Sequence, residues 1–222
     1  MSPVIILYGP ERTPYTEKCR RALVYKSFDF ELRQPEGPED YVRWSPKTGL
    51  LPVMRVDGEL VSDSTDILLK LDELRPDPPL LSSDPMVAEQ QRNLEDWADE
   101  SFLYYFQQWF RLAATTERED GTPQRPRSPF LRRLGAWIRA GGTWERPETA
   151  ILRGLDDRLN DLVNFLGSRR FFYSDQLGMA DLAVYGMLYT MRLGAIPGAD
   201  QIINIRPTLL EFMRRIEETT GG

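Results

Sequence analysis

Residues 49–67 read GLLPVMRVDGELVSDSTDI, and the order of residue types in this stretch decides the fold. An Asp-Gly pair separates two short runs of apolar and β-branched residues. That arrangement is the signal of a two-residue β-hairpin turn. Ser62 or Asp63 then caps a helix that we expect over residues 64–74. The stretch therefore predicts strand, turn, strand and helix in direct succession.

The residues before this stretch complete a small α/β unit. Residues 4–8 (VIILY) form a short apolar run that ends at Gly-Pro, which predicts a buried strand. Thr13-Pro14 opens a helix, because Thr is a good N-cap and Pro suits the first helical position. Apolar and polar residues alternate over residues 28–32, which predicts a second strand. Residues 37–44 predict a short helix.

After a proline-rich linker over residues 76–79 the hairpin signals disappear, and only helical patterns remain. We expect long helices over residues 85–112, 147–166, 179–193 and 207–217, a short basic helix over 130–139 and a loop over 115–129. The fold class is thus an α/β domain followed by an all-α domain. The predicted boundaries are residues 1–78 and 84–222.

Composition excludes much chemistry. The chain has 222 residues, one cysteine and no histidine. Without histidine there is no Ser-His-Asp triad, no Cys-His pair and no imidazole metal site, so we expect no metal cofactor. A single cysteine forms neither a disulfide within the chain nor a CxxC site. The net charge of −6 argues against a general nucleic-acid binder.

The sequence also carries no signal for a membrane or for export. No run approaches the roughly 18 apolar residues of a membrane span. The first residues, MSPVIILYGPERT, lack the basic region and the small-residue cleavage site that a secretory signal has. We therefore expect a soluble, cytoplasmic protein without a membrane partner.

Four segments, in the expected order, resemble the cytosolic glutathione transferase family. They are ILYGPERTPYTEKCRRAL (6–23), GLLPV (49–53), SDSTDI (62–67) and LGMADLAVYG (177–186). The resemblance implies a thioredoxin-like N-terminal domain that binds glutathione and an all-helical C-terminal domain that forms the electrophile pocket. It also implies a homodimer and a role in detoxification.

Leu51-Pro52 stands where the family has Val-Pro. Proline lacks an N–H and suits the start or edge of a strand, so the residues alone favour an ordinary trans proline there. The resemblance implies a cis bond instead. A cis bond would expose the N–H and C=O of Leu51 to the main chain of a ligand, as if to another strand.

Asp63 and Ser64 lie at the expected N-terminus of a helix, where the first N–H groups are unpaired and favour an anion. The resemblance assigns both residues to the glutamyl end of glutathione. Ser64 and the free N–H groups would hold the carboxylate, and Asp63 would pair with the ammonium. The alternative is a plain helix cap that involves Asp66.

Gly178 departs from the family pattern, because the family has Ser or Thr at this helix cap. A glycine cap costs only a few tenths of a kcal/mol relative to serine. We expect Asp181 to bond back to the backbone and fix the start of the helix. Its predicted role is structural and not catalytic.

The family reaction needs the thiolate of glutathione, whose thiol has a pKa of about 8.5 when free. Thr13 is the first candidate donor, because Ser- and Cys-type members carry their active residue in this loop. Tyr8 is the rival, at the strand end where Tyr-type members carry a phenol. Thr16 ranks lower, and it remains open that neither Thr13 nor Tyr8 acts.

Residues 13–16, Thr-Pro-Tyr-Thr, also look like a glutaredoxin Cys-Pro-Tyr-Cys motif with both cysteines replaced. Without those cysteines there is no dithiol and no mixed disulfide at this point, which argues against thioltransferase activity. Cys19, two turns into the helix, is expected to be a small buried hydrophobic residue rather than a nucleophile.

The electrophile pocket is expected between the domains, with Tyr15, Tyr104 and Trp109 as candidate lining residues. The arginine-rich segment 111–146 is either a solvated surface or a mouth that attracts anionic substrates. Trp44 either inserts into a partner subunit or packs in the core.

The predicted function is therefore glutathione transfer to a small hydrophobic electrophile. The alternatives are a binding or scaffold protein without turnover, or a glutathione-dependent isomerase or peroxidase. The sequence leaves open the natural electrophile and whether the thiol is glutathione or another low-molecular-weight thiol.

Overall fold

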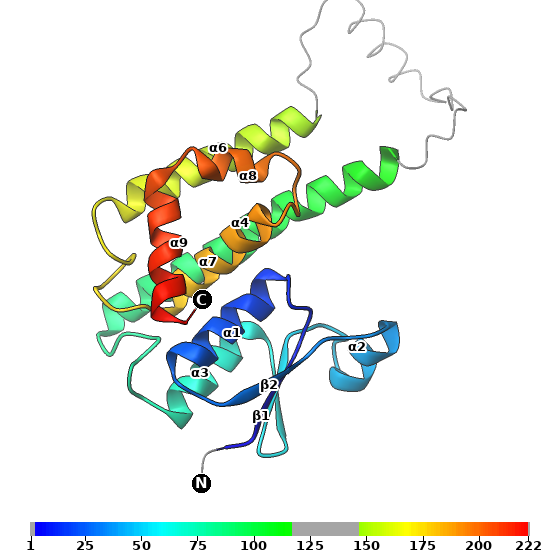
Figure 1. Ribbon diagram of the computed structural model, residues 1–222, viewed down its shortest axis with the longest axis vertical. Helices are drawn as coiled ribbons and strands as arrows, with labels where there is room; N and C mark the ends of the chain where they lie inside the picture. The colour runs from blue at the N-terminus through cyan, green and yellow to red at the C-terminus, as the bar shows by residue number, and fades with distance from the viewer. Residues whose placement is uncertain (1–2, 117–146, 222) are drawn as a thin grey trace, which may run out of the picture.

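The computed structural model describes residues 3–116 and 147–221. Its N-terminal part is built on a four-stranded sheet (Figure 1), with strands β1 (Ile5–Tyr8), β2 (Phe30–Arg33), β3 (Val53–Val56) and β4 (Glu59–Ser62). The order in the sheet is β2-β1-β3-β4, with β1 parallel to β2 and the other pairs antiparallel. This confirms the predicted hairpin and the α/β class of the first domain.

All four residues of β1 are buried, and the residues on its two faces have different neighbours. Ile5 and Leu7 join the main core with residues of α1 (Pro14–Tyr25) and α3 (Ser64–Leu74). Tyr8 instead packs against Trp44, the last residue of α2 (Pro38–Trp44), which stands to one side of the sheet (Figure 1).

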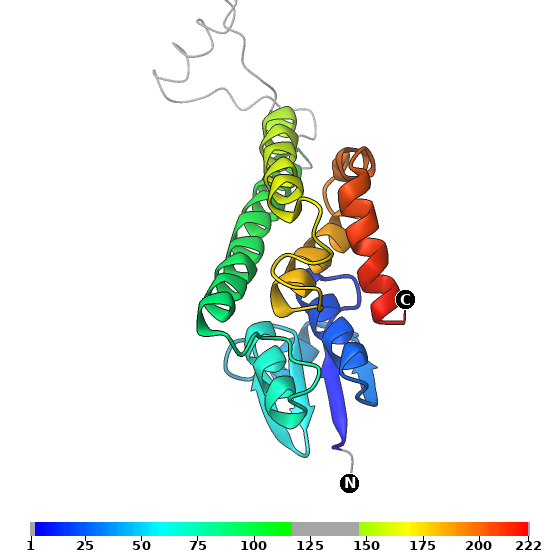
Figure 2. The ribbon, with the colours of Figure 1, turned by 90° about the vertical axis from the view of Figure 1, so that its left-hand side faces the viewer.

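The C-terminal part consists of helices in the described ranges: α4 (Pro85–Thr116), α6 (Pro147–Leu166), α7 (Met179–Arg192), α8 (Ala199–Asn204) and α9 (Pro207–Thr219). Helix α7 is almost entirely buried and lies between α4 and α9 (Figure 2). Across residues 3–116 and 147–221, no helix combines the length and the apolar character needed to cross a membrane.

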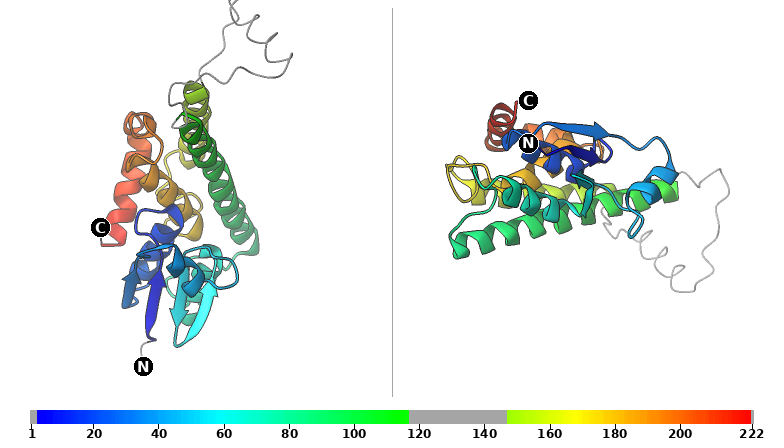
Figure 3. Two further views of the ribbon diagram at one scale, coloured as in Figure 1. Left: turned by 90° about the vertical axis from the view of Figure 1, so that its right-hand side faces the viewer. Right: turned by 90° about the horizontal axis from the view of Figure 1, so that it is seen from below.

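Helix α1 belongs to both parts of the molecule, since it packs on the sheet and also against α7 at the junction (left view of Figure 3). Gly186 of α7 allows this contact, because a Cβ there would lie 2.4 Å from the Pro14 carbonyl oxygen. Arg21 of α1 donates to the hydroxyls of Tyr185 (2.9 Å) and Thr220 (2.8 Å). The two domains are therefore joined by a backbone approach and by buried hydrogen bonds.

The linker is fixed by one buried lysine. Lys26, at the end of α1, donates to the carbonyls of Arg75 (2.5 Å) and Pro78 (2.8 Å) and pairs with Asp72 (2.6 Å). The Asp77–Pro78 bond is cis. The contacts of Lys26 with Arg75 and Pro78 anchor the linker to the first domain.

Asp181 has the predicted structural role. Its carboxylate accepts from the backbone N–H of Gly178 and from that of Phe172, both at 2.9 Å. The side chain is buried, so these bonds replace the water that the carboxylate would otherwise need. The start of α7 and the loop before it are thereby fixed to one group.

The structure refines several predicted boundaries. The second strand is shifted towards the C-terminus, because the N–H of Phe28 bonds to the Leu23 carbonyl and closes the turn after α1. Helix α8, with only six residues, was not predicted. The predicted loop 115–129 and helix 130–139 lie, apart from residues 115–116 at the end of α4, outside the described residues, as does most of the arginine-rich segment 111–146.

Candidate functional site

Three segments that are far apart in the sequence meet at one end of the sheet. Tyr8 of β1 pairs with Val53 of β3, and Val53 pairs with Ser62 of β4. The residues just beyond these pairs are the β1–α1 loop, the Leu51–Pro52 bond and the start of α3. Strand register thus brings together the segments that the sequence resemblance assigned to glutathione binding.

The Leu51–Pro52 bond is cis, which confirms the expectation from the resemblance. Pro52 is buried, while Leu51 is partly exposed. Within the described ranges, the N–H and C=O of Leu51 make no hydrogen bond to the chain. Both groups are therefore open to an extended ligand main chain, in the way that a sheet edge accepts another strand.

Asp63 is the N-cap of α3, and its carboxylate accepts from the backbone N–H of Thr65 at 2.8 Å. Its φ of 82° lies in the left-handed region, which is uncommon for a residue other than glycine. Ser64 follows and is buried, and its hydroxyl has no hydrogen-bond partner in the part of the chain that the structure describes. A strained residue next to an unused hydroxyl at a helix N-terminus suits an anionic group.

Thr13 occupies the N-cap position of α1 with an extended backbone. Its hydroxyl lies 3.0 Å from the Pro10 carbonyl and 2.9 Å from the Thr16 hydroxyl, so its single proton goes to one of these acceptors. Thr13 is partly exposed, whereas Thr16 is fully buried. Of the two residues, only Thr13 has surface that a ligand could contact.

Tyr8 is 4% exposed, and its ring centroid lies 4.8 Å from that of Trp44. The guanidinium carbons of Arg33 and Arg55 lie 6.0 and 5.7 Å from the centre of the ring. The Tyr8 side chain is therefore on the face of the sheet opposite α1 and α3. The contact also shows that Trp44 packs within its own chain.

Cys19 is fully buried in the core, as the sequence predicted. Burial raises the pKa of its thiol far above the usual range, so the thiolate does not form at neutral pH.

The polar surroundings of Tyr15 were not foreseen. Burial, reinforced by the nearby Asp99 carboxylate, raises the pKa of Tyr15 to about 12, so its phenol remains protonated and can donate. Lys18 pairs with Glu95 and, at 3.1 Å, with Asp99. Glu95 and Asp99 are four residues apart on α4, and this helical spacing was the available sequence signal.

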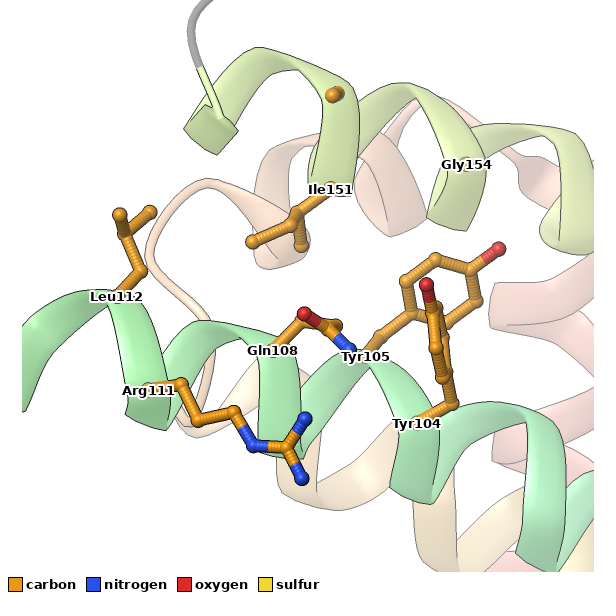
Figure 4. Close-up of a pocket in the computed structure, with 8 residues that line it drawn as sticks. Tyr104, Tyr105, Gln108, Arg111, Leu112, Ile151 and Gly154 are labelled. Carbon is orange, nitrogen blue, oxygen red and sulfur yellow. The ribbon is translucent and has the colours of Figure 1, made fainter. Parts of the chain in front are cut away.

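A cavity of about 570 Å³ lies between α4 and α6 (Figure 4). Gln108 reaches from α4 towards Ile151 of α6, and Tyr105 packs under Gly154. Among the described residues, the cavity is lined by Tyr104 but not by Tyr15 or Trp109.

Helix geometry places Tyr104 on the side of α4 that faces away from the junction. At 100° per residue, Tyr104 lies about 180° around α4 from Glu95, which faces α1, whereas Trp109 lies about 40° from Glu95. Trp109 is therefore on the side of α4 that faces α1, the helix of Tyr15, and Tyr104 is on the opposite side. All three electrophile-pocket assignments stay predictions.

A thioredoxin-like sheet domain that is joined through α1 to a helical domain is the architecture of proteins with the glutathione transferase fold. The sequence model described as "Glutathione S-transferase, N-terminal domain" matches residues 7–79. Residues 7–79 therefore match the N-terminal domain of glutathione transferases. No curated protein matches the chain at a significant level.

Solved structures share the fold over nearly the whole chain. Rice GST1 in complex with glutathione is 20% identical with a TM-score of 0.72, and the match covers 100% of this chain and 90% of that one. The β-etherase LigF from Sphingobium sp. strain SYK-6 is 17% identical with a TM-score of 0.65 (96% and 95%). FzlA from C. crescentus is 20% identical with a TM-score of 0.66 (97% and 92%). At these identities the comparisons show the fold alone.

In the part of the chain that the structure describes, no three His, Cys, Asp or Glu side chains gather as ligands for a metal ion.

Proposed function

We propose that this protein is a glutathione transferase, which binds glutathione at the end of the sheet and transfers its thiolate to a small hydrophobic electrophile. The observation that carries the proposal is the free main-chain N–H and C=O of Leu51, which lie next to the N-terminus of α3. This pair of features can bind a short peptide by its main chain and by its acidic end.

The residues at the site fit glutathione group by group. The cysteinyl N–H and C=O would pair with Leu51 in the manner of an added strand. The α-carboxylate of the γ-glutamyl group would accept from the Ser64 hydroxyl and from free N–H groups of α3. The ammonium of the same group would pair with the exposed carboxylate of Asp63.

The chain would supply hydrogen bonding and orientation. The Thr13 hydroxyl would turn from its present acceptors, the Pro10 carbonyl and Thr16, and donate to the sulfur at the N-terminus of α1, where the helix dipole favours the thiolate. The thiol proton passes to solvent. A carbon–sulfur bond then forms as the thiolate adds to the electrophile or displaces its leaving group, and holding both reactants in one cleft supplies much of the rate.

Isothermal titration of the protein with glutathione tests the binding step. We expect saturable binding with one site per chain, which Asp63→Asn and Ser64→Ala weaken. If both variants bind glutathione as strongly as wild type, or if wild type does not bind it at all, the proposal is contradicted. A parallel titration with another low-molecular-weight thiol tests whether a different thiol is the natural one.

A glutathione-binding protein without turnover is the second candidate, and the position of the Thr13 hydroxyl favours it. That hydroxyl already has two acceptors within its own loop, so it has to leave them before it can donate to sulfur. Glutathione binding without conjugation of chlorodinitrobenzene would support this candidate.

We also propose a homodimer. The prediction is tested by light scattering of the purified chain, where the mass of a monomer would contradict it.

A further inference from the structure

A buried polar cluster lies where α1, α3 and α4 meet. We define it as Lys18, Thr65, Glu95 and Asp99. Lys18 donates to Glu95 Oε1 and, at 3.1 Å, to Asp99 Oδ2. The Thr65 hydroxyl donates to the same Glu95 Oε1 at 2.5 Å. One carboxylate oxygen of the helical domain thus binds both α1 and α3 of the sheet domain.

The hydrogen bonds from Lys18 and Thr65 hold the Glu95 carboxylate in place. The side chains of Lys18 and Glu95 are each 1% exposed. Burial by itself lowers the pKa of Lys18, but the charges of Asp99 and Glu95 outweigh burial and raise the pKa, so Lys18 is charged. The other oxygen of Glu95, Oε2, is buried and has no hydrogen-bond partner in the described chain. Since Oε2 offers no anchor, the bonds to Oε1 determine where this carboxylate lies.

Thr65 connects this cluster to the first turn of α3. Its backbone N–H donates to the Asp63 carboxylate at 2.8 Å, while its hydroxyl donates to Glu95. The turn that contains Ser64 is therefore held both by its own cap and from the opposite domain.

We infer that Glu95 is a positioning residue for the candidate site. It acts through Thr65 and fixes the first turn of α3 relative to α1 across the domain junction. The inference rests on the proposed function where it concerns glutathione. The turn binds the γ-glutamyl end of the ligand, so the position of α3 determines affinity, while the reacting sulfur lies near Thr13 at the start of α1.

Loss of the Thr65 hydroxyl should therefore affect binding and leave the chemical step unchanged. A hydrogen bond to a charged group contributes about a factor of ten or more. We expect Thr65→Val to weaken glutathione binding about tenfold and to raise KM for glutathione by a similar factor. The kcat should stay within about twofold, which is the pattern of lost ground-state binding.

The experiment compares wild type, Thr65→Val, Thr65→Ser and the control Thr219→Val. The control loses a threonine hydroxyl that donates to the Arg215 carbonyl within α9. Glutathione affinity is measured by titration calorimetry, and the mobility of residues 64–67 by hydrogen exchange without ligand. In Thr65→Val we expect exchange at these amides to become about tenfold faster. Thr65→Ser should restore both quantities, and the control should change neither.

Each outcome decides the inference. If Thr65→Val keeps the affinity and exchange of wild type, or if Thr219→Val changes them equally, the positioning role is overturned. If wild type does not bind glutathione while exchange at residues 64–67 still increases in Thr65→Val, the proposed function fails and the positioning of α3 by Glu95 stands. If Thr65→Val does not fold, Glu95→Gln is measured in its place, with the same expectations for exchange and affinity.

Discussion

The hydroxyl of Thr13 and the phenol of Tyr8 differ in their freedom to reach a ligand. Thr13 is partly exposed at the start of α1, and the acceptors of its hydroxyl proton, the Pro10 carbonyl and Thr16, belong to the same short segment. Tyr8 lies between Trp44 and two arginines, Arg33 and Arg55, on the face of the sheet opposite α1 and α3. The geometry therefore favours Thr13 as the donor.

We predict that Thr13→Ala lowers kcat/KM for the conjugation of glutathione to chlorodinitrobenzene by roughly 10- to 100-fold, because the thiolate loses a hydrogen bond to its charged form. Tyr8→Phe should stay within about threefold of wild type. Steady-state assays of both variants check this. Full activity in Thr13→Ala, combined with a loss in Tyr8→Phe, would assign the role to Tyr8.

Asp181 gives a stability prediction. Asp181→Ala leaves the N–H groups of Gly178 and Phe172 buried and unpaired, so the free energy of unfolding should fall by about 2–4 kcal/mol. Urea unfolding measures the change. Asp175→Ala is the control, because Asp175 is exposed in the loop just before α7, and its effect should stay below about 0.5 kcal/mol. Equal effects in the two variants would remove the special role of Asp181.

Helices α1 and α7 approach each other where Gly186 faces the backbone of Pro14. Backbone atoms cannot move aside as a flexible side chain can, so the space for this contact exists only because residue 186 has no Cβ. The contact also fixes the start of α1, where the candidate donor lies.

We predict that Gly186→Ala lowers the free energy of unfolding by about 1–3 kcal/mol, because overpacking forces the two helices apart. Gly37→Ala is the control, since the atoms nearest to its Cβ would be those of the flexible Glu39 carboxylate. Thermal unfolding of both variants gives the comparison. A Tm for Gly186→Ala equal to that of Gly37→Ala would show that the helices adapt at no cost.

The junction of the domains also makes the stability of the molecule depend on pH. Burial raises the pKa of Asp99 to about 6, against the opposing effect of Lys18, and the charges of Glu95 and Asp63 add to the rise. The ordinary pKa of an aspartate in an unfolded chain is about 3.9. The folded state therefore binds this proton more tightly than the unfolded state.

The sign of the effect follows from this difference. The stabilisation by protonated Asp99 is fully present below about pH 4 and is lost as the pH rises through about 6. We predict that the unfolding free energy of wild type minus that of Asp99→Asn decreases as the pH rises from about 4 through about 6. Urea unfolding at several pH values measures it. A difference that grows with pH would mean that the attraction of Lys18 outweighs burial.

Much of the fold follows from local patterns. The hairpin, the cap at Asp63 and the helix over residues 64–74 lie within one short stretch, so hydrogen bonds between near neighbours determine them. The resemblance to a family added the cis bond before Pro52, which the structure confirms, and the assignment of residues to a glutathione site, which stays a prediction. The hairpin, the cap and the helix could be predicted because each depends on residues close together in the sequence.

Tertiary structure alone decided the contacts between distant segments. Lys18 and Glu95 are 77 residues apart, and nothing in the sequence around either residue indicates that the two pair in the core. The face of the sheet that Tyr8 occupies, and the side of α4 that carries Tyr104, depend on how strands and helices pack. Local sequence determines which elements form, but the burial of charge and the direction of side chains are properties of packed elements. For this reason the sequence by itself determined the sheet-and-helix framework, and only the folded chain placed Thr65, Glu95 and Lys18 together at the junction of the two domains.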